Sequence, residues 1–333
     1  MLPDPAQKRT NRGTDLAFYT VCDHKHFLGL VGLINSLRLQ GHDDPVYVLD
    51  RGLEDWQRDA LADEAVLVSS SDSTPPTLLK HVVPLAHPAD VMVVADVDLI
   101  FTGNIHGLAA EVHASQKPVF FSNDWVDRFY PEWEAFGFGT PVRHSYVNAG
   151  LMILPAEGAH HFLDMLAVGQ ERLDLGQTLF APDVVRPADP FFYADQDVLN
   201  AMLGTVVPLD DLTIAPRTAA AYWPFPGLRL VDSRTLRCEF VDGGEPVVLH
   251  HILAKPWSGK VGPSVYSRCL TRLLCEPDVA VRVPIDAVPR HLRTTRSASA
   301  LRMWISGKAW VHSRTRGKLG IRRQLRRRRL RAA

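Results

Sequence analysis

Two carboxylates one residue apart, Asp96 and Asp98, directly follow the apolar run 91–95. Five consecutive apolar residues, mostly β-branched, predict a buried parallel strand. A buried strand cannot carry unpaired charges, so we expect both carboxylates at or just beyond its carboxyl end. Ligands bind at that edge of open α/β sheets, and two carboxylates at this spacing can share a divalent cation that holds a diphosphate. A strand followed by an acidic turn is the other interpretation, because short motifs often match by chance.

The elements that position these carboxylates follow from an alternation of strands and helices over the first part of the chain. Strands are expected at 16–21, 46–49, 66–68, 91–95 and 118–121. Helices are expected at 27–39, 53–65 and 78–85. Further along, strands are expected at 147–154 and 247–250, and a helix at 195–202. This alternation predicts an α/β fold with a mostly parallel sheet and helices on both faces.

An aromatic segment, residues 122–145, differs in composition from the rest of the chain. It contains Gly137, Gly139 and Pro141 together with six aromatic residues, namely Trp125, Phe129, Tyr130, Trp133, Phe136 and Phe138. A loop of this length is uncommon unless it binds something, which makes it a candidate acceptor-binding segment. The other interpretation is a flap that packs onto the body of the protein.

The composition is that of an ordinary globular protein, with 46% hydrophobic and 22% charged residues among 333, which argues against a disordered chain. No run of about 18 apolar residues predicts a membrane-spanning helix, and the first residues lack the apolar core of a signal peptide. The cysteines show neither CxxC pairing nor zinc-site spacing; they are Cys22, Cys238, Cys269 and Cys275. Reduced thiols in a cytoplasmic protein are the simplest account.

Charge is divided unevenly along the chain, although the formal net charge is zero. Residues 290–333 contain 15 Lys and Arg and no Asp or Glu, so residues 1–289 carry 22 basic and 37 acidic residues, a net charge of −15. We therefore expect a flexible lead-in at 1–14, one domain at 15–289 and a basic tail at 290–333.

The basic tail mixes arginines with Trp and Leu, a composition that suits an anionic membrane surface and a peripheral location on it. Nucleic acid is another polyanion that such a tail can meet, and we expect it less. A solvated tail, or one bound to the acidic body, is the remaining interpretation.

Five segments, in this order, resemble the motifs of glycosyltransferase family 8, the group of glycogenin and the bacterial lipooligosaccharide galactosyltransferases. They are 20–23 with Phe27, 96–98, 148–150, 195–200 and 250–257. The resemblance implies a GT-A fold, with a Rossmann-like, mixed and mainly parallel sheet flanked by helices. It also implies a retaining transferase that uses Mn²⁺ or Mg²⁺ and moves a hexose, glucose or galactose, from a UDP-sugar to a glycan or glycolipid acceptor.

The same resemblance assigns the residues that hold the metal and the diphosphate. Asp96 and Asp98 match the metal ligands of the family, together with one histidine. Lys80 lies where the family often has a basic residue near the donor, and Lys255 matches the lysine that reaches the diphosphate. Taken alone, the segment around Lys255 is also typical of a packed turn.

Four further residues match the family's contacts to the donor sugar. Asn148 matches a residue that meets this sugar, and Asp195 matches a carboxylate that grips its hydroxyls. Gln196 matches the side chain on the β face of the anomeric carbon, with Asp197 beside it. Gln196 or Asp197 could stabilise the positive charge that forms at C1. Alternatively, the acceptor attacks C1 from the same face from which the leaving group departs. Acidic residues at a helix start also serve as caps, and that interpretation stays open.

At the nucleoside end, Val21 and Asp23 match the family's contacts to the base and the ribose. Phe27 lies where the family usually has a tyrosine that stacks on uracil. A phenylalanine keeps the ring face and loses the hydroxyl.

The chain departs from the family at the metal-binding histidine. Both His250 and His251 precede Lys255, the glycine usually found in this loop is absent, and the loop is one or two residues shorter. We favour His250 as the metal ligand because it is the first histidine after the apolar run 247–249. A hydrogen-bonded core histidine is the other interpretation for either residue.

Two other functions compete with glycosyl transfer. A haloacid-dehalogenase-like phosphatase also has a strand that ends in Asp-x-Asp, but that pattern continues with Gly and Thr, whereas residues 99–101 are Leu-Ile-Phe. A non-catalytic protein that binds nucleotide sugars is compatible with the two departures at Phe27 and the histidine loop. Turnover of a UDP-sugar separates the enzyme from this binding protein.

Overall fold

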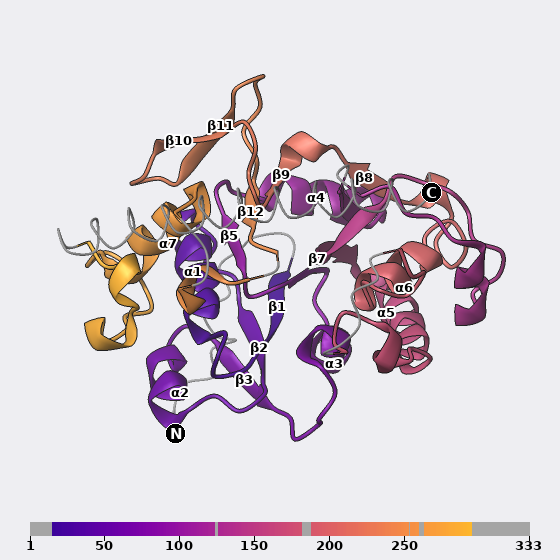
Figure 1. Ribbon diagram of the computed structural model, residues 1–333, viewed down its shortest axis with the longest axis horizontal. Helices are drawn as coiled ribbons and strands as arrows, with labels where there is room; N and C mark the ends of the chain where they lie inside the picture. Colours follow the sequence, from indigo (N-terminus) through magenta and orange to yellow (C-terminus); the bar gives the residue numbers. More distant parts are fainter. Residues whose placement is uncertain (1–14, 124–125, 182–187, 253, 260–262, 295–333) are drawn as a thin grey trace, which may run out of the picture.

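The computed structural model describes residues 15–123, 126–181, 188–252, 254–259 and 263–294. Its central sheet has the strand order β3-β2-β1-β4-β7-β6-β8 (Figure 1). The strands are β1 Leu16–Cys22, β2 Val46–Asp50, β3 Val66–Ser69, β4 Val91–Ala95, β6 Val119–Ser122, β7 Val147–Pro155 and β8 Thr213–Ala215. Four of the neighbouring pairs are parallel and two are antiparallel, so the sheet is mixed and mainly parallel, as expected.

Helices cover both faces of this sheet because its strands are apolar on both sides. In β1, Leu16 and Phe18 belong to one core, and Ala17 and Tyr19 belong to the other. The first core includes residues of α1 Phe27–Leu39, α4 His106–Ser115 and α7 Val265–Cys275. The second includes residues of α3 Val82–Ala86, α5 Ala156–Glu171 and α6 Asp195–Met202. Figure 1 shows α1 and α7 on one side and α5 and α6 on the other.

Strand β7 runs antiparallel to both of its neighbours, β4 and β6. The start of β7 therefore lies beside the carboxyl end of β4, and the Asp96 N–H donates to the Gly150 carbonyl at 2.8 Å. This reversal brings the segment 148–150 to the edge of the sheet where the two expected metal-binding carboxylates lie.

A second, three-stranded sheet has the order β5-β12-β9, with β5 Leu99–Phe101, β9 Ala220–Tyr222 and β12 Val248–His250. In the β5–β12 pair His250 lies opposite Leu99, so the register places this histidine next to the residue that follows Asp98. The remaining strands, β10 Leu228–Asp232 and β11 Arg237–Phe240, form a hairpin that extends from the body (Figure 1). Among the described residues, no helix has the length and apolar character that a membrane crossing requires.

Two expected helices have different limits in the structure. Helix α2 covers only Asp55–Leu61, because a capping box between Glu54 and Gln57 fixes its start. The expected helix at 78–85 is divided into the 3₁₀ helix η2 Pro76–Leu79 and helix α3, and Lys80 lies at the break. Helices α1 and α6 have the expected limits.

The aromatic segment packs onto the body through part of its length. Its 3₁₀ helix η3 Pro131–Phe136 buries Trp133 and Phe136, which are each 2% exposed, in the core shared with α5 and α6. The Trp133 indole N–H donates to the Pro190 carbonyl at 2.6 Å. Trp125 lies outside the described residues. The flap interpretation therefore holds for the inner side chains of this segment.

The folded body continues past the expected boundary at residue 289. Leu292 is 1% exposed and packs in the first core, and His291 Nε2 lies 2.7 Å from the Pro256 carbonyl oxygen. Residues 290–294 thus belong to the body rather than to the basic tail. The rest of the expected tail, and the expected lead-in at 1–14, lie outside the described residues.

Candidate active site

The two carboxylates lie in a tight turn between β4 and β5. The Asp96 carbonyl accepts the Leu99 N–H at 3.1 Å, which closes the turn immediately after β4. Asp98 is 4% exposed, whereas Asp96 is half-buried. Both residues therefore leave the buried strand at its carboxyl end, as the sequence predicts.

His250 is the histidine that the structure brings to these carboxylates. Its Nε2 lies 3.2 Å from Asp98 Oδ1 and 3.8 Å from Asp96 Oδ2. The three side chains form a group whose candidate ligand atoms all lie within 4.8 Å of one another. Gly150 permits this position, because a Cβ there would lie 2.3 Å from His250 Cε1.

His251 lies in an apolar environment instead. Its ring is packed among Trp223, Phe225 and Tyr266, and it is fully buried. Burial, with a further contribution from the charge of Lys255, lowers the pKa of His251 to about 4. The imidazole is therefore neutral near pH 7. His251 is a core histidine, but neither of its ring nitrogens has a hydrogen-bond partner among the described residues, so the hydrogen-bonded interpretation does not hold for it.

Lys255 reaches Asp98 from the 3₁₀ helix η7 Pro256–Ser258, which begins directly after it. Its Nζ forms an ion pair with Asp98 and donates to the His251 carbonyl at 3.2 Å. Burial opposes ionisation of Asp98, but Lys255 and His250 outweigh it and hold the pKa of this carboxyl well below its usual range. Asp98 is thus a carboxylate at every ordinary pH.

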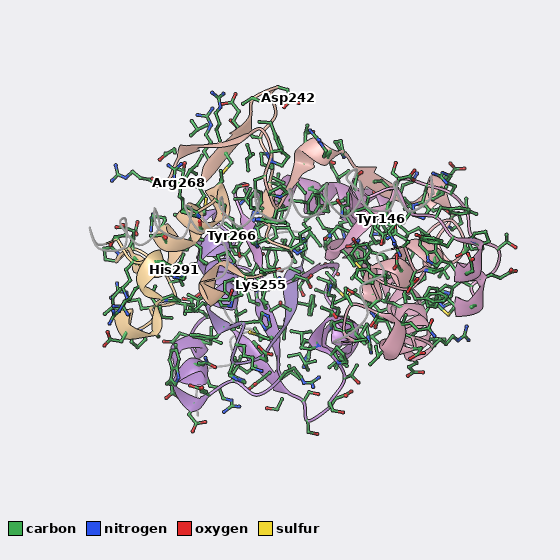
Figure 2. All side chains as sticks on the ribbon, in the orientation of Figure 1. Tyr146, Asp242, Lys255, Tyr266, Arg268 and His291 are labelled. Atoms are coloured by element: carbon green, nitrogen blue, oxygen red, sulfur yellow. The ribbon has the colours of Figure 1, made fainter. Side chains whose placement is uncertain are left out.

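Trp257 anchors the Lys-Pro-Trp segment on the first helix. Its indole N–H donates to the Lys25 carbonyl at 2.9 Å, just before α1. A Cβ at Gly29 of α1 would lie 2.5 Å from the Trp257 ring, so the glycine makes room for the indole. In Figure 2, Lys255 lies toward Tyr266 and His291, on the side of α1 and α7.

Lys80 joins the carboxylate turn to helix α6. Its Nζ lies 2.7 Å from Asp96 Oδ1 and 2.9 Å from Asp195 Oδ2, and it donates to the Ala149 carbonyl at 2.9 Å. Burial alone would lower the pKa of Lys80, but Asp195 and Asp96 raise it above its usual value. Burial raises the pKa of Asp195 despite this lysine. A protonated lysine, only 5% exposed, therefore bridges the two acidic segments.

Gln196 meets Asn148 across the gap between α6 and β7. The Asn148 Nδ2 donates to Gln196 Oε1 at 2.8 Å, and the Gly150 N–H donates to Asn148 Oδ1 at 2.8 Å. One turn later, Asn200 bonds both the N–H and the C=O of Val147. These bonds fix the start of α6 against the start of β7.

Asp197 turns away from this group into a buried network. Arg128 holds it with two bonds, from Nε to Oδ1 at 2.9 Å and from Nη2 to Oδ2 at 2.8 Å. The Tyr146 hydroxyl donates to Oδ1 at 2.8 Å, and the Tyr193 N–H donates to Oδ2 at 2.7 Å. Both oxygens of Asp197 are thus engaged, and burial raises its pKa even against Arg128. The sequence pattern did not single out Arg128.

The nucleoside end differs from its expectation at Phe27. This side chain is 1% exposed and belongs to the first core, with its ring centroid 5.0 Å from that of Trp56 in an edge-on contact. A ring buried in this way cannot stack on a base, so the predicted stacking role of Phe27 is wrong. Its neighbour His26 is half-buried, and its Nδ1 lies 2.7 Å from Asp23 Oδ1. Val21 is half-buried near the end of β1.

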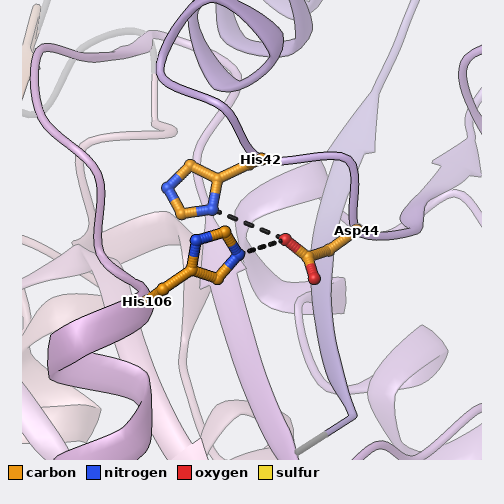
Figure 3. Close-up of side chains that lie close together, drawn as sticks. All are labelled: His42, Asp44 and His106. Carbon is orange, nitrogen blue, oxygen red and sulfur yellow. Dashed lines mark hydrogen bonds and ion pairs between the residues drawn. The ribbon is translucent and has the colours of Figure 1, made fainter. Parts of the chain in front are cut away.

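A second group with metal-ligand residue types, His42, Asp44 and His106, lies beside the start of α4 (Figure 3). His106 Nε2 and His42 Nδ1 lie 2.8 and 3.5 Å from Asp44 Oδ2. The Ile105 N–H donates to His42 Nε2 at 3.1 Å, so Nε2 has no proton and Nδ1 must carry one. A protonated Nδ1 cannot bind a metal. We interpret the group as hydrogen-bonded side chains that hold the start of α4 in place.

Comparisons with known proteins identify the fold. No family model and no curated protein matches the chain. A solved structure of an active-site mutant of LgtC aligns over 81% of this chain and 98% of its own, with 16% identity and a TM-score of 0.54. An apo structure of WbbM, a bifunctional glycosyltransferase, aligns over 80% of this chain and 50% of its own, with 12% identity and a TM-score of 0.50.

A further LgtC structure, of a galactosyltransferase in complex with donor and acceptor sugar analogs, aligns over 73% of this chain and 89% of its own, with 17% identity and a TM-score of 0.49. The alignments with the mutant LgtC and WbbM cover about four fifths of this chain, including its mixed, mainly parallel sheet. The chain therefore has the GT-A fold that the sequence predicts.

Proposed function

We propose that the protein is a retaining, metal-dependent glycosyltransferase of family 8 that moves a hexose from a UDP-sugar to a glycan or glycolipid. One observation carries this proposal. Residues from four segments of the chain, 80, 96–98, 195 and 250–255, converge at the carboxyl end of β4, and they combine carboxylates, an imidazole and two lysines. This convergence occurs in a fold shared with glycosyltransferases.

The metal ligands in this proposal are Asp96, Asp98 and His250. Two carboxylates and one imidazole, all within 4.8 Å, form a donor set that suits Mn²⁺ better than Ca²⁺, which prefers oxygen ligands alone. When bound, the metal would neutralise the negative charge that develops on the diphosphate as its bond to C1 of the sugar breaks. Lys255 would add a fixed positive charge to the same diphosphate without any proton transfer.

The donor sugar would lie between Asn148, Asp195 and Gln196. Asp195 can accept hydrogen bonds from sugar hydroxyls, and Lys80 keeps its carboxylate oriented. Gln196 is already held by Asn148, so its amide has a defined position for the anomeric carbon. Because both oxygens of Asp197 are engaged in the buried network, we assign Asp197 to holding α6 rather than to contact with the sugar.

At the nucleoside end, we propose that Val21 and Asp23 contact the base and the ribose, with His26 in place of Phe27 as the stacking ring. Asp23 orients the His26 ring by its 2.7 Å contact with Nδ1. The acceptor would approach along the exposed side chains of the aromatic segment, and the basic tail would bring the enzyme to an anionic membrane that carries lipid-linked acceptors.

The experiment that tests this function measures UDP release from a panel of UDP-sugars, with Mn²⁺ and with EDTA. We expect release from one donor, its loss with EDTA, and a loss of about 100-fold or more in Asp98→Asn. Exposed Asp59 on α2 supplies the control, because Asp59→Asn makes the same chemical change outside the carboxylate turn.

Two outcomes would contradict the proposal. If the protein binds UDP but releases no UDP from any combination of donor and acceptor, a non-catalytic nucleotide-sugar-binding protein is favoured. Hydrolysis of a generic phosphate ester that depends on Asp96 would favour the phosphatase.

A further inference from the structure

Arg128 forms a buried ion pair that no sequence motif indicates. It belongs to the aromatic segment, is 7% exposed, and holds Asp197, which is fully buried, with two parallel bonds. A charged pair of this kind is costly to bury unless its geometry and remaining hydrogen bonds are good.

Three further contacts of this pair reach one short turn, residues 189–194, which leads into α6. Arg128 Nη2 donates to the Asp189 carbonyl at 2.7 Å, and its guanidinium lies 4.8 Å from the centre of the Tyr193 ring. Asp197 accepts the Tyr193 N–H at 2.7 Å. Arg128 and Asp197 thus hold this turn at both ends.

The turn ends in a strained residue. Ala194 has φ 48° and ψ −113°, a conformation that residues with a Cβ rarely adopt, and it is completely buried. Strain of this kind persists only where the surrounding structure imposes it. The next two residues are Asp195, which contacts Lys80, and Gln196, which contacts Asn148.

From this geometry we infer that Arg128 is a positioning residue, which through Asp197 holds the strained turn and so fixes Asp195 and Gln196 relative to the donor. The inference rests on the proposed function, because it concerns the placement of those two side chains. Arg128 also ties the aromatic segment to the start of α6. An acceptor bound against that segment would therefore lie against a part of the chain that is fixed to Asp195 and Gln196. Tyr146, which bonds the same carboxylate, lies in the half of the molecule with α5 and α6 (Figure 2).

The test compares Arg128→Gln and Arg128→Lys with the wild type. Lysine keeps the charge but cannot make the two parallel bonds, so it serves as the milder variant if glutamine prevents folding. The control is Arg237→Gln, which removes an exposed ion pair with Glu245 on the β10–β11 hairpin. Three quantities are measured: kcat for sugar transfer, the affinity for UDP and Mn²⁺ by calorimetry, and amide hydrogen exchange of 189–202.

We expect kcat to fall about 100-fold in Arg128→Gln and about tenfold in Arg128→Lys, because misplacement by about 1 Å has such effects. The affinity for UDP and Mn²⁺ should change less than about threefold, because Asp96, Asp98 and His250 make none of these contacts. Faster exchange in 189–202 should accompany the loss, and Arg237→Gln should match the wild type in all three quantities.

Two results would overturn the inference. The first is wild-type kcat in a folded Arg128→Lys and Arg128→Gln, whatever happens to thermal stability. The second is an equal loss of kcat and of UDP affinity, which would indicate general unfolding. Failure of the proposed function has a different signature, because the wild type itself would then release no UDP from any donor.

Discussion

Gly150 lies so close to His250 that its residue type bears directly on the candidate metal site. A Cβ at this position would lie 2.3 Å from His250 Cε1 and 2.8 Å from Nδ1, so one of the two must move. In Gly150→Ala we expect the imidazole to shift away from Asp98 and the affinity for Mn²⁺ to fall by about tenfold or more, measured by calorimetry.

The control for this change is Gly107→Ala, in a helix where a Cβ meets nothing within 4 Å. There we expect unchanged Mn²⁺ affinity and a gain in stability of up to about 1 kcal/mol, because alanine is the better helix former. Unchanged affinity in Gly150→Ala would remove His250 from the ligand set.

Phe27 is the stacking ring expected from the sequence and His26 is the proposed one, and a pair of variants separates them. In His26→Ala we expect the KM for the UDP-sugar to rise about tenfold, since stacking on a base contributes ~1–3 kcal/mol. In Phe27→Leu we expect an unchanged KM and a loss of about 1–2 kcal/mol of unfolding free energy, because Phe27 is a core residue. The opposite pattern would restore Phe27 as the stacking ring. Both quantities come from donor kinetics and urea denaturation.

Sequence reasoning locates the residues of this site better than it assigns their partners. Asp96 and Asp98 could be placed because an apolar strand cannot carry charge, and that argument needs only local sequence. The burial of Phe27 and the pairing of Asp197 with Arg128 depend on segments 29 and 69 residues away. No periodicity reports such contacts, so local sequence could not predict them.

At the level of elements, the direction of strand β7 was not predicted, although the family resemblance placed its segment 148–150 in the site. In a wholly parallel sheet, the start of this strand would lie at the edge opposite Asp96. The structure reverses β7, so Asn148 and Gly150 lie beside the carboxyl end of β4. Alternating patterns identify strands but carry no information on their direction, and here only the family resemblance indicated the neighbourhood.

Asp50 controls the turn from β2 into α2, and it makes stability depend on pH. Its carboxylate accepts the Gly52 and Leu53 N–H groups at 2.9 and 2.7 Å, and the Arg58 guanidinium at 2.7 Å. Burial opposes ionisation, but these bonds lower the pKa of Asp50 below its usual value. The ionised form therefore stabilises the fold above pH ~4, and this contribution is lost as the pH falls through the lowered pKa.

We expect Asp50→Asn to lose about 1–2 kcal/mol of unfolding free energy at pH 7, because hydrogen bonds to a charged group are removed. The difference from the wild type should shrink below pH ~4, where Asp50 becomes protonated in the unfolded chain. Urea denaturation at pH 7 and pH 3.5 measures both values, with Asp59→Asn as the exposed control. A difference that is the same at both pH values would contradict the assigned ionisation.

At the scale of the whole molecule, removal of the basic tail tests its role, and the result depends on the residue at which the chain is cut. A chain ending at 289 would lose Leu292, which is buried in the first core. A loss of membrane binding could then not be separated from a loss of stability. A chain ending at Thr294 keeps these contacts and removes the basic residues beyond.

We expect the full chain to sediment with phosphatidylserine vesicles at low salt and the chain ending at 294 to stay in solution. Each Lys or Arg near an anionic surface contributes about 1 kcal/mol, and salt screens that attraction. Replacing Arg326–Arg329 with glutamine should give intermediate binding. Equal sedimentation of full and truncated chains would reject a membrane role, and binding to RNA but not to vesicles would favour nucleic acid.

The ion pair between Asp98 and Lys255 joins residues 157 positions apart, and the contact between Lys80 and Asp195 spans 115. Contacts that close long loops form slowly, because the chain must lose much conformational freedom before they form. During synthesis the β1–β4 region emerges before Lys255, so Asp98 meets this cation only after most of the domain has been made, whereas Lys80, the cation beside Asp96, precedes it in the chain. We therefore expect the contact between Asp98 and Lys255 to form late in folding, after contacts between residues nearer in sequence.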